Sequence, residues 1–207
     1  MTASGERRIL VATRSAHKLR ELRELLGLSR TALVSLDELG LAGDPVEDGA
    51  TFEANALIKV RFWAARTRLP VLADDSGLEV EALRWGPGVR TRRYAGEVAT
   101  DAQNNAKLLD ELAGLPPQRR AARYVCVLAF LASATAEPLV RRGTFVGRIA
   151  PAARGSGGFG YDPIFEPASE PPGGRTVGQM TAVEKNAVSH RAVAARAMGQ
   201  ALRELGY

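Results

Sequence analysis

Residues 72–78, which read LADDSGL, place two neighbouring carboxylates and a hydroxyl directly after an apolar run. Adjacent carboxylates repel each other, so the pair is costly unless a cation or a proton neutralises part of its charge. Open α/β sheets bind their ligands at the carboxyl ends of strands. The pair therefore indicates a metal or catalytic carboxylate site, and a polar loop that merely closes the strand is the alternative.

Two segments have side chains suited to binding phosphate or metal. In TRSAHK, residues 13–18, Lys18 and the backbone N–H groups of a helix start can attract an anion, although the glycines of a P-loop are absent. EDGATFEANALIK, residues 47–59, has three acids near a helix start, and Asn55 and Lys59 share one face because they are four residues apart. A solvated, well-capped helix is the alternative for the second segment.

Two later segments are suited to a nucleobase. In GGFGYDPIF, residues 157–165, Phe159 and Tyr161 flank a glycine that permits close backbone approach, which favours a flat base stacked on a ring. A packed turn with core aromatics is the alternative. EKNAVSHR, residues 184–191, could supply donors to an oxo-base and phosphates, or could simply be a helix cap with surface charge. Its donors are Lys185, Ser189, His190 and Arg191.

Apolar periodicity predicts the elements that position these side chains. Leu19, Leu22, Leu25 and Leu26 line one face of a helix that Gly27 closes, between strands at 8–12 and 32–36. Thr51 is expected to cap a helix to about residue 66, and Pro70 to open a strand that ends at the aspartate pair. The remaining expected elements are a helix at 100–112, a strand hairpin at 123–133 and 139–149, and a helix at 189–205; residues 37–50 and 85–96 read as loops.

Composition describes an ordinary globular protein of 207 residues, with 45% hydrophobic and 25% charged residues, which is enough for one sizeable core. The apolar run at 125–132 is too short for a membrane span, and the first residues lack the apolar region of a secretory signal. Cys126 is the single cysteine and lies in that run, so a buried, structural thiol and a reducing cytoplasm are expected. The net charge of +5 suits an anionic partner, either a phosphate-bearing small molecule or nucleic acid.

Taken together, these blocks are more specific than each one alone. In chain order they are VATRSAHK, EDGATFEANALIK, LADDSGLEVEAL, PGVRTRRYAG, GGFGYDPIF and EKNAVSHR. This order and spacing resemble the inosine/xanthosine triphosphate pyrophosphatase family over residues 9–205. LADDSGLEVEAL and GGFGYDPIF carry most of the resemblance.

The resemblance implies a cytoplasmic, homodimeric, Mg²⁺-dependent enzyme that splits deaminated purine nucleoside triphosphates such as ITP, dITP and XTP into a monophosphate and pyrophosphate. The implied fold is α/β, with a long mixed bent β-sheet and flanking helices forming two lobes around a central nucleotide-binding cleft, in one domain over residues 1–207. The implied partner is the purine nucleotide, with no membrane and no stable nucleic-acid complex.

Roles are carried over only at positions that match the family motifs. Asp75 matches the catalytic acid that also meets the metal, and Glu47 becomes the second metal candidate. The family usually has an acid at position 54, where this chain has Ala54; Glu53 cannot be assumed to replace it, because one residue rotates a helical side chain by about 100°. Ser15 stands where the family usually has Asn. The substrate-binding positions are Thr13, Arg14, Ser15, Ala16, His17, Lys18, Lys59, Ser76, Phe159, Gly160, Tyr161, Asp162, Lys185, His190 and Arg191.

Two alternative functions stay open at this point. One is a related pyrophosphatase that acts on pyrimidine or methylated nucleotides. The other is a non-catalytic binder of nucleotide or RNA, which the net positive charge favours. The acids at 47, 48, 53, 74 and 75 count against the binder, because they would repel a polyanion unless a metal ion is present.

Overall fold

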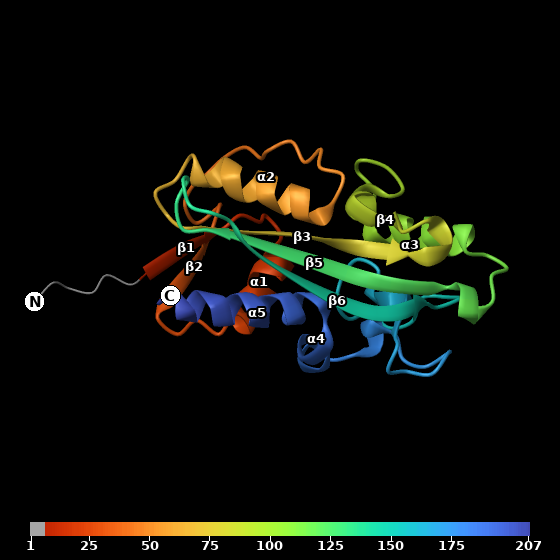
Figure 1. The fold of residues 1–207 in the computed structure, drawn as a ribbon. Helices are drawn as coiled ribbons and strands as arrows, with labels where there is room; N and C mark the ends of the chain where they lie inside the picture. Colours follow the sequence, from red (N-terminus) through yellow and green to blue (C-terminus); the bar gives the residue numbers. More distant parts are fainter. Residues whose placement is uncertain (1–6) are drawn as a thin grey trace, which may run out of the picture. The chain divides into compact units, whose positions relative to one another are not determined.

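A mixed seven-stranded β-sheet runs through the computed structural model, which describes residues 7–207 (Figure 1). The strand order is β2-β1-β3-β5-β6-β7, and β4 pairs with β3. β1 is parallel to both of its neighbours, whereas β3 with β4 and β6 with β7 are antiparallel. The strands are β1 (Arg7–Val11), β2 (Thr31–Ser35), β3 (Val71–Val80), β4 (Gly86–Pro87), β5 (Ala121–Leu131), β6 (Leu139–Ile149) and β7 (Phe165–Pro167).

The chain divides into two compact units. The first contains the described residues up to Asp75 together with residues 126–143 and 191–207, and the second contains residues 76–125 and 144–190. One boundary falls between Asp75 and Ser76 inside β3, and another falls between His190 and Arg191. Residues 1–6, part of the start on which the absence of a secretory signal was predicted, lie outside the described residues.

The prediction that a strand ends at the aspartate pair is wrong, because β3 continues to Val80. Its first residues pair with β1, where Val11 is opposite Leu72, and its last residues pair with β4. Since β1 ends at Val11, the two acids lie just past the carboxyl end of β1 and in the middle of β3. Ligands were expected where β3 ends. The two acids lie instead beside the carboxyl end of β1.

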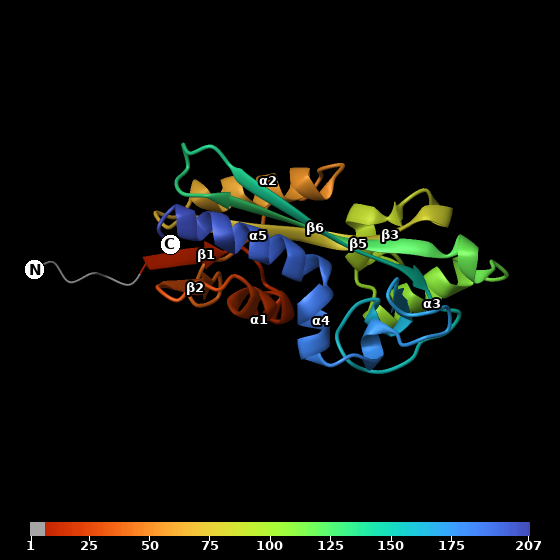
Figure 2. The ribbon, with the colours of Figure 1, turned by 60° about the horizontal axis from the view of Figure 1, so that its bottom comes forward.

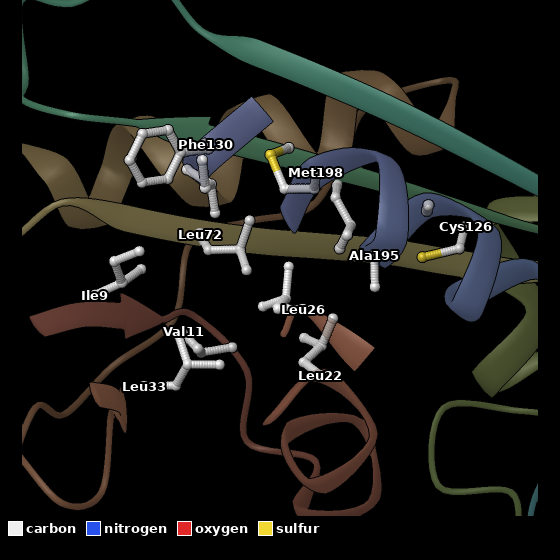
Figure 3. Packing of buried hydrophobic residues seen from close by; sticks show 13 residues of the cluster. Ile9, Val11, Leu22, Leu26, Leu33, Leu72, Cys126, Phe130, Ala195 and Met198 are labelled. Carbon is white, nitrogen blue, oxygen red and sulfur yellow. The ribbon is translucent and has the colours of Figure 1, made fainter. Parts of the chain in front are cut away.

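In the first unit, alternating strand residues are buried against helices. Ile9 and Val11 belong to one apolar cluster with Leu22 of α1 (Ala16–Leu25) and Met198 of α5 (His190–Glu204), so α1 and α5 cover the same face of these strands (Figure 3). α2 (Phe52–Ala64) covers the opposite face (Figures 1 and 2). The leucine stripe predicted for 19–26 thus packs as expected.

Side-chain caps fix where the helices begin, so functional residues beside them have defined positions. Ser15 and Thr51 accept hydrogen bonds from the backbone of Lys18 and Ala54 at the starts of α1 and α2. Gly27 follows α1 with φ +61°, the left-handed conformation that favours glycine. The predicted cap at Thr51 and the glycine stop after α1 are confirmed.

The second unit contains α3 (Asp101–Glu111) and α4 (Ala182–Val188). Its own apolar cluster includes Leu78, Phe165 and, from α3, Leu108. The helix predicted from about residue 189 to 205 is confirmed as α5, whereas α4, which ends at its extended C-cap Ser189, was not predicted. Short 3₁₀ helices lie at Glu81–Leu83, Gly88–Arg93, Pro117–Arg119, Asp162–Ile164 and Val177–Gln179. Within residues 7–207, no helix has the length and apolar character that crossing a membrane requires.

Candidate active site

Two carboxylates converge on one ammonium group in the first unit. Lys59 Nζ lies 2.9 Å from Glu47 Oε2 and 3.0 Å from Asp75 Oδ1. Asn55, one helical turn before Lys59, donates from Nδ2 to Asp75 Oδ2 at 3.3 Å and accepts from the Gly49 N–H at 2.8 Å. The predicted shared face of Asn55 and Lys59 is confirmed, and both side chains reach Asp75.

Burial raises the pKa of the Asp75 carboxyl, and the charge of Asp74 raises it further, while Lys59 and Lys18 offset only part of this rise. Burial would lower the pKa of Lys59, but Asp75, Asp74 and Glu47 together raise it. The ammonium therefore stays charged, and the carboxylate beside it has a raised proton affinity. A carboxylate in such a site is suited to accepting a proton.

Asp74, the neighbouring acid, has the opposite environment. Its carboxylate lies 2.8 Å from Lys18 Nζ and 3.6 Å from an Arg191 guanidinium nitrogen, and only 2% of the residue is exposed. Burial would raise the pKa of this carboxyl, but Lys18, Arg191 and Lys59 outweigh burial and hold the pKa well below its usual value. Asp74 is therefore a permanently ionised group that fixes two cations, and Asp75 is the one suited to proton transfer.

The turn before α1 has the features of an anion site. Thr13 Oγ1 accepts from the Ser15 N–H at 3.2 Å, and Ser15 caps the helix, whose first turn contains no acid. The backbone N–H groups of Ala16 and His17 lie at this helix start, where the helix dipole favours an anion. Lys18 reaches Asp74 from the same turn.

Arg14 belongs to that turn in sequence, but its side chain has other partners. Its guanidinium donates to Asp44 and Asp37 at 2.9 and 2.8 Å and to the carbonyls of Leu41 and Gly43 at 3.0 and 2.8 Å. These bonds fasten the loop after β2 to the turn. The Arg14 side chain therefore has a structural role in this arrangement.

The glycine-rich segment and Lys185 form a second cluster, within the second unit. Asp162 Oδ2 accepts from the Phe159 N–H at 2.9 Å and from Lys185 Nζ at 2.8 Å. Lys185 Nζ also lies 4.2 Å from the centroid of the Phe159 ring. Gly158 has φ +74°, and a Cβ there would overlap the Asp162 carboxylate, so this tight turn needs glycine. The half-buried Phe159 ring is held in place by the turn and by a cation on one face.

The other aromatic of this segment is a core residue. Tyr161 is 4% exposed, belongs to the apolar cluster of the second unit, and donates its hydroxyl to the Thr91 carbonyl at 2.7 Å. For Tyr161 the packed-turn alternative therefore describes the structure, whereas Phe159 has the partial exposure that stacking on a base requires. Ser76, half-buried in β3, opens this unit directly after Asp75.

Tyr124, a residue that the sequence did not single out, contacts two of the predicted ones. Its ring stacks on His190 with centroids 4.7 Å apart and planes 7° apart, and its hydroxyl donates to Asp162 Oδ1 at 3.3 Å. Glu21 was also missed: it pairs with Arg191 in the first unit. Glu21 lies one helical turn after Lys18, and that spacing was the available signal. Tyr124 lies inside an apolar strand pattern, which gave no signal.

The carboxylates of the first unit could hold a magnesium ion. Mg²⁺ is typically bound through one or two protein carboxylates, several waters and substrate phosphates. Glu47 and Asp75 meet this need because both already face one cation, whereas Glu53 is exposed at the start of α2. Among residues 7–207 no group of three His, Cys, Asp or Glu side chains is placed to hold a metal ion by itself. Glu47 and Asp75 would supply the two carboxylates of such a site.

The chain is similar to known proteins over almost its whole length. A family model described as the Ham1 family matches residues 9–201. A "dITP/XTP pyrophosphatase" of Mycolicibacterium paratuberculosis is 48% identical over 95% of this chain and 96% of its own, and one of Salmonella paratyphi A is 45% identical over 95% and 98%. A solved structure of a HAM1 protein from Coxiella burnetii is similar with a TM-score of 0.87 and 40% identity, covering 96% of this chain and 99% of that one.

Proposed function

Because the chain belongs to the Ham1 family, we propose that it hydrolyses deaminated purine nucleoside triphosphates such as ITP, dITP and XTP to the monophosphate and pyrophosphate. The observation that carries this proposal is the unlike pair Asp74 and Asp75, one fixed as a carboxylate between two cations and the other buried with a raised pKa beside Lys59. The relatives named dITP/XTP pyrophosphatase support the substrate class.

In the proposed reaction, Asp75 accepts a proton from a water molecule whose oxygen bonds to the α-phosphorus. The bond from that phosphorus to the bridging oxygen breaks, and its electron pair leaves with pyrophosphate. Lys18, Lys59 and the N–H groups at the start of α1 offset the growing negative charge of the phosphates. Phe159 presents its ring to the base, and Lys185 keeps that ring and Asp162 in one arrangement.

Magnesium is the proposed cofactor, held by Asp75 and Glu47. A bound Mg²⁺ ion offsets phosphate charge and helps to orient a water molecule and the triphosphate. Lys59 already contacts both carboxylates, so its ammonium keeps the two acids together in the free protein and lies close to where the phosphates would bind.

Pyrophosphate release from ITP, measured with 5 mM Mg²⁺ or with excess chelator on the order of 10 mM, tests both function and cofactor. We expect release with magnesium and its loss with chelator, and full recovery when magnesium is added back. XTP should behave like ITP, while ATP, dCTP and 5-methyl-dCTP should be poor substrates. Faster release from the pyrimidine or methylated nucleotides would favour the related pyrophosphatase, and tight RNA binding without any hydrolysis would favour the non-catalytic binder.

Replacing Phe159 by alanine should weaken nucleotide binding by about 1–3 kcal/mol, the usual scale for loss of base stacking on an aromatic ring. The loss should be similar for ITP and XTP because both bases have a π-face. The matched control is Phe62→Ala, since Phe62 is also half-buried and lies under a cation, Arg66, 3.5 Å from its ring centroid. Unchanged affinity together with a sharp fall in Tm of the Phe159 variant would make the ring a structural element only.

The homodimer and the cytoplasmic location stay predictions from the family resemblance. Light scattering after size-exclusion chromatography would measure the mass in solution, for which we expect twice that of one 22.1 kDa chain.

A further inference from the structure

Helix α3 holds the two peptide groups on either side of Gly160, the residue that follows Phe159. The Gly160 N–H donates to Asp101 Oδ2 at 2.7 Å, and the Gly160 carbonyl accepts from Asn105 Nδ2 at 3.1 Å. Asp101 and Asn105 are four residues apart in α3, so they share one helical face and reach both ends of the same residue. One helix face therefore fixes the orientation of the peptide groups around Gly160.

The backbone of Gly160 can adopt several conformations unless hydrogen bonds restrain it. Its φ is +62°, and a Cβ built on it would meet no atom within 4 Å, so packing around the Cα does not restrain it. Glycine loses more conformational freedom on ordering than any other residue. The two hydrogen bonds from α3 therefore restrain this residue in addition to the turn itself, in which the Asp162 N–H donates to the Phe159 carbonyl at 3.3 Å. Phe159 is attached directly to Gly160.

The side-chain amide of Asn105 is buried but only partly hydrogen-bonded, which a role in stability alone does not explain. It is 91% buried in the second unit, and within residues 7–207 its Oδ1 atom has no hydrogen-bond partner. The side-chain amide cannot be turned over to satisfy that oxygen, because Oδ1 would then face the Gly160 carbonyl. A buried polar group that is only partly satisfied calls for an explanation in function, and the held Gly160 carbonyl supplies one.

The same helix also fixes the preceding loop of this unit. Asn104 accepts from the Ala95 N–H at 2.8 Å and donates to the Arg92 carbonyl at 2.9 Å. Through Tyr161, whose hydroxyl bonds to Thr91, that loop is joined to the glycine-rich segment as well. α3 thus connects two loops through side-chain to backbone bonds and acts as their common support.

We propose that Asp101 and Asn105 are positioning residues for nucleobase recognition, which hold the two peptide groups flanking Gly160 and so set the orientation of the Phe159 ring before the nucleotide binds. This inference rests on the proposed function. The clamp, meaning Asp101, Asn105 and the backbone of Gly160 between them, acts on binding and leaves Asp75 and its cation partners unchanged. Loosening the clamp should therefore raise KM for ITP and leave kcat close to that of the wild type.

The test compares Asn105→Ala, Asp101→Ala and Asp101→Asn with the control Asp110→Ala. Asp110 is an exposed acid of the same helix and is not in the proposed site. Asn105→Ala and Asp101→Ala should raise KM about tenfold each, as expected when a hydrogen bond that pre-organises a binding loop is lost. Asp101→Asn keeps the acceptor oxygen and loses only the charge, so it should restore most of the affinity. The control should leave KM unchanged.

A second measurement keeps the test independent of turnover. Amide hydrogen exchange over residues 157–162 of the nucleotide-free protein should speed up in both alanine variants and stay unchanged in Asp101→Asn and Asp110→Ala. Unchanged exchange in the alanine variants, or faster exchange with unchanged KM, would overturn the positioning role. Absence of pyrophosphate release from ITP by the wild type would instead overturn the proposed function, and the nucleotide role of the clamp would fall with it.

Discussion

Asp75→Asn lowers pyrophosphate release from ITP by about 10²–10⁴-fold, the usual contribution of a positioned general base. The amide keeps the shape of the carboxylate, and its oxygen can still accept from Lys59, so the Kd for ITP should change little. Single-turnover kinetics and calorimetric titration with ITP measure the two effects separately. A rate within a few-fold of the wild type would move the base elsewhere, with Glu47 and Asp74 the next acids to test.

The same variant should not lower the thermal stability of the free protein. The folded-state pKa of Asp75 is raised by burial, so its ionised form is less favourable in the folded than in the unfolded state once the pH exceeds that pKa. Removing the charge at neutral pH therefore removes a destabilising contribution to the folded state. Tm at pH 7 should equal or exceed that of the wild type. Asp110→Asn, which changes an exposed acid in the second unit, is the control for both activity and Tm.

Arg191→Met should lower the free energy of unfolding by about 3–5 kcal/mol, the cost of removing one partner from a buried ion pair. Arg191 is 1% exposed and pairs with Glu21 and Asp74. Without it, Asp74 keeps Lys18 as its near cation and Glu21 loses this partner. Urea unfolding at pH 7 measures the difference.

The matched control is Arg196→Met, because Arg196 lies on the same helix and is exposed. Exposed ion pairs contribute about 0–1 kcal/mol, so this variant should stay near the wild type. The pKa of Asp74 is depressed in the folded state; its contribution is therefore complete above the ordinary carboxyl pKa of about 4 and is lost only as the pH falls toward the folded value. A loss of stability in Arg191→Met that is no larger than in Arg196→Met would mean that this pair does not support the fold.

Much of the fold was predictable because local signals agree with the tertiary structure. Thr51, Thr100 and the leucine stripe of α1 mark helix ends and faces, and these features depend on neighbours in the sequence. The end of β3 was not predictable in the same way, because acids usually close a strand. Here β3 continues to pair with β4 after its partner β1 has ended, which is a contact between residues distant in sequence.

The candidate site was likewise predictable only in part. The motif blocks identified Asp75, Lys59, Glu47 and Phe159 as site residues, and the structure places the first three in direct contact. Sequence could not distinguish the environments of Asp74 and Asp75, because burial and cation contacts decide them. Arg191, one of the predicted donors to an oxo-base and phosphates, has two carboxylate partners in the first unit. The backbone N–H groups of Phe159 and Gly160 donate to Asp162 and Asp101.

Cys126, the single cysteine of the chain, is completely buried in the core of the first unit (Figure 3). Burial raises the pKa of its thiol to about 12, so the thiolate that reacts with alkylating reagents is scarce at neutral pH. A cysteine introduced at an exposed position would therefore be labelled alone, without first removing the native one. Ser156, exposed directly before the glycine-rich segment, offers such a position, and a fluorophore there would report nucleotide binding in real time.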